Sequence, residues 1–116
     1  MKRETIVRLS KSYEESAYQE NGLEYWLARD LQVLLDYDEW RNFSKVIEKA
    51  KTACEKSGQD VADHFVDFSK TIPMPKGASK SVDDIMLTRY ACYLIAQNGD
   101  PRKEQIALST VKKLKK

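Results

Sequence analysis

The clearest hydrophobic pattern lies in the middle of the chain, where apolar side chains recur at intervals of three and four residues. They are Trp40, Phe43, Ile47, Ala50 and Cys54. This spacing places all five on one face of an α-helix. Asp38 precedes the pattern as a suitable N-cap, and Gly58 follows it at a position where helices favour glycine. The pattern therefore predicts a helix over residues 39–57.

Weaker patterns predict four more helices. One covers residues 2–19 and another residues 27–35, where leucines gather on one side. Residues 87–97 are apolar nearly all round, which is typical of a central, buried helix. The last helix begins after Asp100, a good N-cap, with Pro101 in the first helical position.

The segment between the central and the buried helix has the pattern of a hairpin. Residues 64–72 and 82–88 are candidate strands, and the loop between them contains Pro73 and Pro75, which lack a backbone donor. The chain has 116 residues, which fits one domain over 1–116. We predict an α+β fold that is mainly α, with about five helices, a helix-turn-helix-like pair and a small antiparallel hairpin.

The distribution of charged residues along the chain is more informative than the net charge. The net charge is +2. The segment 102–116 holds six basic residues and one acidic residue, a net +5, so the remainder carries −3. The basic character is therefore concentrated in the last helix and the tail that follows it.

The sequence offers little material for catalysis or metal binding. Its one histidine, His64, and its two distant cysteines do not have zinc-site spacing, and the glycines form no phosphate loop. Cys54 and Cys92 lie among apolar residues, so we expect buried free thiols and a reducing compartment. No apolar run has the length of a membrane span or a signal peptide. We expect a cytoplasmic protein without a cofactor, a metal or enzymatic activity.

The helices predicted over 27–35 and 39–57 resemble a helix-turn-helix pair, whose second helix begins in the major groove of DNA. Arg41, Asn42 and Lys45 would then lie near bases, and Lys49 further along, with Arg29 on the first helix. Arginine suits guanine and asparagine suits adenine. The alternative is an ordinary solvated face, which the pattern alone favours, because amphipathic helices usually carry one.

The basic tail has two interpretations of equal weight. Lys112 and Lys113 could contact phosphates and give salt-dependent affinity that does not depend on base sequence. They could equally stabilise the C-terminus of a helix by complementing its dipole.

Five segments carry a resemblance to known proteins, namely residues 24–31, 35–43, 53–58, 63–65 and 89–101. Together they resemble the bacterial DNA-damage-inducible protein D family and, more distantly, the Bro-N domains of phage antirepressors. The resemblance implies a cytosolic bacterial protein of the SOS response, and its Bro-N part implies DNA binding. It supplies no catalytic motif. The family usually has glycine where this chain has Asp36, so we expect a left-handed backbone there. Family members continue beyond the last helix, so activities that need that part are expected to be absent.

Two functions follow from these observations. The first is a DNA-damage-response module that binds DNA, single- or double-stranded, and acts in the regulation of recombination or repair. The alternative is a protein-interaction module that docks on a DNA-bound partner, such as a recombinase filament, without touching DNA. The excess of acidic residues before the basic tail motivates this alternative. The sequence leaves the oligomeric state open.

Overall fold

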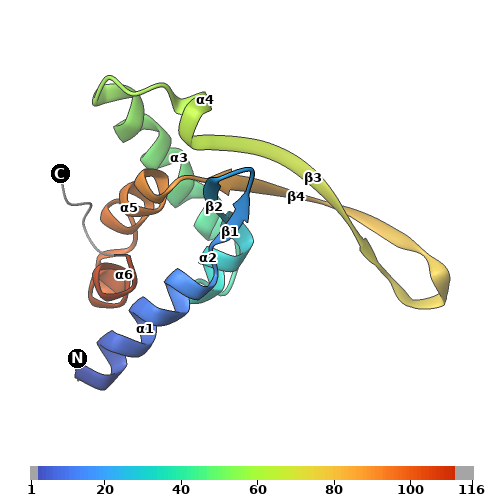
Figure 1. The fold of residues 1–116 in the computed structure, drawn as a ribbon, viewed down its shortest axis with the longest axis horizontal. Coiled ribbons are helices and arrows are strands. Elements are labelled where there is room, and N and C mark those ends of the chain that lie inside the picture. Colours follow the sequence, from blue (N-terminus) through green and yellow to red (C-terminus); the bar gives the residue numbers. More distant parts are fainter. Residues whose placement is uncertain (1–2, 112–116) are drawn as a thin grey trace.

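The computed structural model describes residues 3–111 and consists of a helical body from which a long two-stranded arm projects (Figure 1). The α-helices are α1 (Arg3–Glu15), α2 (Ala28–Leu34), α3 (Trp40–Lys56), α4 (Val61–His64), α5 (Arg89–Gln97) and α6 (Glu104–Thr110). The strands are β1 (Tyr18–Glu20), β2 (Leu23–Leu27), β3 (Phe65–Pro73) and β4 (Ser79–Leu87). Two 3-10 helices are η1 (Pro75–Gly77) and η2 (Pro101–Lys103).

The four strands form one antiparallel sheet in the order β1-β2-β4-β3. β2 pairs with β4 only at Trp26↔Leu87 and Leu27↔Met86. β3 and β4 pair with each other over their whole length. Beyond the body, β3 and β4 therefore continue without a third strand, and we call residues 68–84 the arm.

The central helix was predicted correctly. α3 runs from Trp40 to Lys56, and the predicted apolar face is buried except for the half-buried Trp40. The predicted cap is wrong, because Glu39 occupies the N-cap position and its side chain makes no capping hydrogen bond. Burial of one helix face explains the success, since a half-buried helix must repeat its apolar residues with the helical period.

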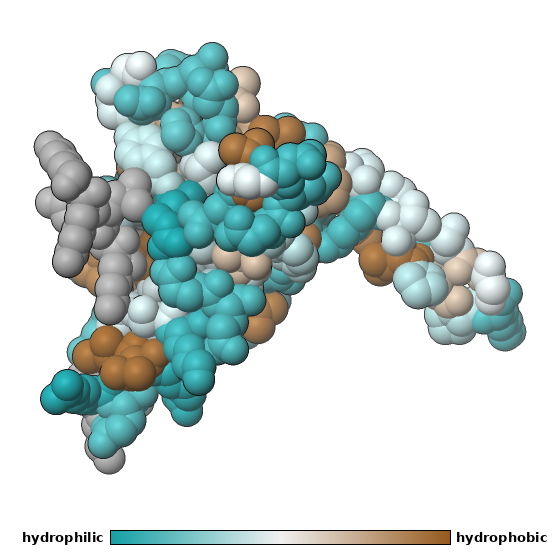
Figure 2. Space-filling model, in the orientation of Figure 1, coloured by the Kyte–Doolittle hydropathy of each residue, from teal (hydrophilic) through white to brown (hydrophobic). Residues whose placement is uncertain are grey.

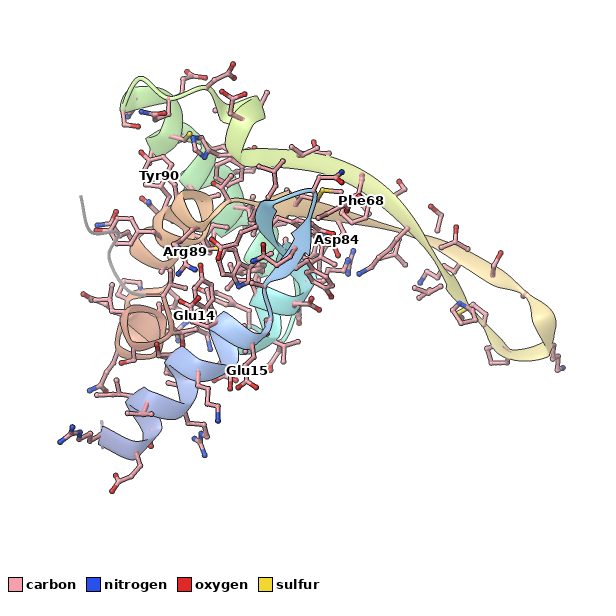
Figure 3. The ribbon with its side chains drawn as sticks, viewed as in Figure 1. Glu14, Glu15, Phe68, Asp84, Arg89 and Tyr90 are labelled. Carbon is pink, nitrogen blue, oxygen red and sulfur yellow. The ribbon has the colours of Figure 1, made fainter. Side chains whose placement is uncertain are left out.

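The core is closed by α5, which is largely buried, as its apolar composition predicted. The ring of Tyr13 stacks on that of Trp26 at 4.5 Å between centroids, and the indole nitrogen of Trp26 donates to the Tyr13 carbonyl at 2.8 Å. Arg89 lies over Trp26 and binds Glu14 and Glu24, so α1, β2 and α5 meet at one point (Figure 3).

The predicted fold class is wrong in its proportions. A mainly α domain of about five helices with a small hairpin was expected, whereas the described residues contain six α-helices and a four-stranded sheet with strands of up to nine residues. The short, polar β1 explains part of the error, because it is exposed at all three positions and lacks the alternation of a half-buried strand. β3, by contrast, alternates between exposed and half-buried positions over residues 67–73, and the predicted hairpin strands, 64–72 and 82–88, lie close to β3 and β4.

The end of the described chain also differs from the expected single helix. Asp100 caps a helical segment, as predicted, by accepting a hydrogen bond from the Arg102 amide at 2.9 Å, but this segment is the short η2. α6 then begins at Glu104. None of the described helices is long and apolar enough to cross a membrane.

Candidate nucleic-acid interface

A groove of about 560 Å³ lies between α3 and η2 and gathers basic residues from both. We call it the α3 groove. The residues that carry its chemistry are Asn42, Lys45, Lys49, Asp100, Arg102 and Lys103. It joins segments that are more than fifty residues apart in the sequence.

One wall of the α3 groove is a polar stripe of α3. Asn42, Lys45 and Lys49 follow one another at intervals of three and four residues, so they share one side of the helix. All three are exposed. Among the described residues, neither Lys45 nor Lys49 has an ion-pair partner, so both ammonium groups are available to a ligand.

The opposite wall is η2, whose basic residues are held by acidic neighbours. Arg102 donates from Nε and Nη2 to the two carboxylate oxygens of Asp100 at 3.1 and 2.9 Å. These side-chain bonds, together with the bond from the Arg102 amide, hold the pKa of Asp100 below its ordinary value. The Arg102 side chain is 90% exposed, so it can contact a ligand while it remains paired.

A set of tertiary contacts fixes η2 against the loop between α2 and α3. Asp36 has a φ of +65°, as expected for the position where the family has glycine. Its carbonyl accepts a 2.6 Å hydrogen bond from Nζ of Lys103, which also lies 5.3 Å from the Tyr37 ring centroid. The Tyr37 hydroxyl accepts from the Asp100 amide at 2.8 Å. A Cβ on Gly99 would lie 2.5 Å from that hydroxyl, so this approach requires glycine.

The electrostatic character of the α3 groove is mixed. Four basic residues line it, but so do Asp38, Glu39 and Asp100, which leaves a net charge of +1. Arg102 is paired with Asp100, and Lys103 lies 3.8 Å from the Asp36 carboxylate. The cationic character of the groove therefore comes mainly from Lys45 and Lys49.

Of the other predicted site residues, Arg29 and Arg41 do not line this groove. Arg41 is 79% exposed at its side chain and lies 3.6 Å from the Glu39 carboxylate. Arg29 lies at the root of the arm, where its Nε donates to the Asp83 carbonyl at 2.7 Å and its guanidinium stacks 4.1 Å from the Trp40 ring centroid. The predicted Lys112 and Lys113 fall outside the described residues.

The sequence prediction missed two residues of the α3 groove. Arg102 and Lys103 were counted in the basic tail, but more distal lysines were chosen as its binding residues. The available signal was the Asp100-Pro101 cap, which fixes the chain just before these two residues. Their position opposite α3 depends on the Tyr37–Asp100 contact, which no local pattern encodes.

Reactive groups elsewhere in the described chain are engaged or buried. His64 Nδ1 lies 2.7 Å from the Thr88 hydroxyl, and its ring packs against that of Tyr90. Cys54 and Cys92 are buried free thiols, as predicted. Burial raises the pKa of Cys92 to about 12. Within residues 3–111, no group of three or more histidine, cysteine or acidic residues could hold a metal ion.

Comparison with known proteins identifies the family. The model of the BRO family, N-terminal domain, matches residues 16–113, a span that includes both the α3 groove and the arm. The chain belongs to this family. It is 48% identical over 87 residues to DNA damage-inducible protein D of Escherichia coli strain K12, a match that covers 75% of this chain. The matched region spans about a third (32%) of that relative's length. No solved structure matches the chain.

Proposed function

We propose that this chain is the DNA-binding module of a DNA-damage-response protein. The observation that carries the proposal is the α3 groove, in which Lys45 and Lys49 are exposed and have no ion-pair partner within residues 3–111. A lysine without a partner can neutralise a phosphate without first losing an internal ion pair, so its full charge contributes to counterion release.

The side chains of the α3 groove contact different parts of the DNA. Lys45 and Lys49 act as point charges toward the phosphate backbone, and Arg102 adds a planar guanidinium at the opposite wall. Asn42, on the same stripe, carries an amide with both donor and acceptor groups, the combination that pairs with the adenine edge in the major groove. Phosphate contacts position the protein, and Asn42 supplies the base contact.

Family membership and the similar protein support both DNA binding and a role in the response to DNA damage. BRO membership accords with DNA binding, and the name of the similar protein, DNA damage-inducible protein D, supports a role in the response to DNA damage. On this proposal the chain binds DNA without catalysing a reaction on it. It acts in the cytoplasm, where bacterial DNA is located.

A second candidate is docking on a DNA-bound protein, such as a recombinase filament, without contact to DNA. The acidic residues favour it, because residues 1–101 carry a net charge of −3 and acidic side chains lie within the α3 groove itself. Such a module would bind its partner in the absence of nucleic acid, and nuclease treatment would leave the complex intact.

The experiment that tests the proposal changes two charges in the α3 groove. Replacing Lys45 and Lys49 with glutamine should weaken DNA binding and reduce the slope of log K against log salt by about 2. The matched control is the double change Arg8→Gln and Lys11→Gln, which removes two exposed charges from α1. Equal affinity of the α3 variant and the control would exclude the α3 groove as the interface.

A further inference from the structure

The outer part of the arm projects away from the helical body (Figures 1 and 2). Its strands pair without interruption from Phe68↔Asp84 to Pro73↔Ser79. Isolated two-stranded hairpins are marginally stable in water. A ribbon of this length that projects from the domain is suited to contact a ligand outside it.

The outer part of the arm has a consistent positive charge. Between residues 69 and 82 the chain contains Lys70, Lys76 and Lys80 and no acidic residue, which gives a net charge of +3 over fourteen positions. By contrast, the α3 groove has a net charge of +1. The part of the arm between residues 69 and 82 is therefore purely cationic, whereas the whole arm also holds Asp83 and Asp84 and has a net charge of +1.

Strand register separates the side chains of the arm into two kinds of face. Lys70 pairs with Val82, and Ile72 with Lys80, which puts lysine and apolar side chains together on one face. A groove of about 600 Å³ runs along this face and is also lined by Arg29. The opposite face carries the hydroxyl groups of Ser69, Thr71, Ser79 and Ser81, together with Pro73 and Asp83. The Ser69 hydroxyl donates to the Asp83 carboxylate at 3.1 Å.

The tip of the arm is a tight turn with an apolar and a basic side chain. Met74 is 41% exposed, and its amide donates to the Ala78 carbonyl at 2.9 Å to close the turn. Lys76 and Gly77 both have positive φ values, 64° and 75°. The conformation is strained for lysine, and Lys76 lies at the most distal part of the arm.

The root of the arm is fixed to the body by polar contacts that centre on the buried Asp84. The Asp84 carboxylate accepts from Nζ of Lys70 at 2.8 Å and from the Arg29 amide at 3.1 Å, and Arg29 also binds the Asp83 carbonyl. These bonds hold the direction of the arm relative to α2. Ordering of the arm on a ligand therefore costs less than ordering of a free loop.

We propose that the arm is a second DNA-binding element, which lies in the major groove of duplex DNA. The inference rests on the proposed function that the chain binds DNA. The major groove is about 12 Å wide and admits a two-stranded β-ribbon. Lys76 and Lys80 contact phosphates, the hydroxyl groups of Thr71, Ser79 and Ser81 donate to phosphate oxygens, and Met74 lies at the base edges, where it can contact thymine methyl groups.

A second copy of the chain is the main competing occupant, and charge disfavours it. In a two-fold symmetric pairing the same surface meets itself. The lysine face of one arm would then meet the same lysines on the other, and like charges opposite one another destabilise a strand pair. A polyanion gives the complementary charge.

The first test shortens the arm of the otherwise intact chain. Replacement of residues 72–80 by Asn-Gly retains Thr71↔Ser81 as the closing pair, and this dipeptide forms the two-residue turn that such a pair requires. The Lys70–Asp84 bond at the root is kept. A second variant, Lys76→Gln with Lys80→Gln, leaves the backbone intact, so that a loss of binding cannot arise from a folding defect.

Both variants are titrated by fluorescence anisotropy against a duplex and a single strand of equal length, beside the Lys45→Gln, Lys49→Gln variant. We expect both arm variants to bind duplex several-fold more weakly, with a salt slope reduced by about 2, and to bind single strands as the wild type does. If only the α3 variant loses affinity, the arm inference is overturned and the proposed function stands. If the wild type binds no DNA, both fail.

A direct readout of contact uses a photoactivatable crosslinker on the variant Lys76→Cys, which is selective because Cys54 and Cys92 are buried. Crosslinks to duplex DNA that form from this position but not from Lys11→Cys on α1 support the inference. Analytical sedimentation measures the oligomeric state, and one of its outcomes would contradict the proposal. A wild-type dimer that becomes monomeric on arm shortening would identify a second copy as the occupant and overturn the proposal.

Discussion

The carboxylate of Asp84, which is 1% exposed, accepts a 2.8 Å hydrogen bond from the ammonium group of Lys70 on the neighbouring strand. Its other oxygen accepts from the amides of Arg29 and Ile85 at 3.1 and 2.8 Å. Leu27, the N-cap of α2, has no capping side chain, so Asp84 supplies the cap from the arm (Figure 3). One buried carboxylate thus joins the arm to α2.

Replacement of Asp84 by alanine should lower the free energy of unfolding by about 3 kcal/mol, because it leaves the Arg29 amide and the Lys70 ammonium without their buried acceptor. Denaturant-induced unfolding measures this change. Asp67→Ala is the matched control, since Asp67 is an exposed carboxylate on the same strand pair. Equal losses for the two variants would contradict the role given to Asp84.

Tyr37→Phe should remove one hydrogen bond and leave the packing of the ring in place. The Tyr37 hydroxyl accepts from the Asp100 amide at 2.8 Å, while its ring packs 5.0 Å from that of Phe43. We expect the free energy of unfolding to fall by about 1 kcal/mol. DNA affinity should fall as well, because η2 loses a contact that positions it opposite α3. Unchanged stability and affinity would show that this bond does not hold the groove.

Arg89→Lys should destabilise the junction of α1, β2 and α5. The guanidinium binds both carboxylate oxygens of Glu14 at 2.7 and 2.8 Å and also Glu24, a geometry that lysine cannot reproduce. All three side chains are a third or more exposed, so water screens the pair and we expect a loss of about 1 kcal/mol. Thermal unfolding beside Arg41→Lys, whose ion pair is exposed, measures it. No difference between these two variants would argue against the junction.

The native thiols should be unreactive in the folded state. Burial raises the pKa of Cys92 from its ordinary value of 9.0 to about 12, so the folded protein keeps this thiol protonated where the unfolded chain loses the proton. The stability contribution of the protonated thiol is complete below about pH 9 and is lost as the pH rises toward 12. Burial also raises the pKa of Tyr13, so the stability contribution of its protonated hydroxyl is likewise lost as the pH rises.

A disulfide-exchange reagent at pH 8 tests this expectation. We predict reaction of both cysteines in denaturant and of neither in the native protein. Rapid reaction of the native protein would show that the α5 core opens readily, in contradiction to the packing described for Cys92.

A helix or strand could be predicted from the sequence when it buries one face against the rest of the protein. α3 was predicted because its buried residues must recur with the helical period. The two strands of the arm were predicted at 64–72 and 82–88, close to β3 and β4, and of β4 only the first three residues, 79–81, were left outside the predicted strand. All three of these residues are exposed, so burial gives no signal there. Strand pairing, and not burial, determines the extended conformation there.

The candidate site was predicted in part for the same reason. Periodicity placed Asn42, Lys45 and Lys49 on one side of α3, and the structure brings them together. The opposite wall arises from contacts between residues 37 and 100, which are distant in the sequence. Such contacts depend on how helices dock, and spacing along the chain does not report that. The role of the site in DNA binding stays a prediction.

The measurement that tests the central claim most directly is a fluorescence-anisotropy titration of the wild-type chain against duplex and single-stranded oligonucleotides at low and moderate salt. The account predicts binding at low salt that weakens steeply as salt rises, with preference for the duplex. Absence of binding to either form at low salt would contradict the account and leave docking on a protein partner as the function of this chain.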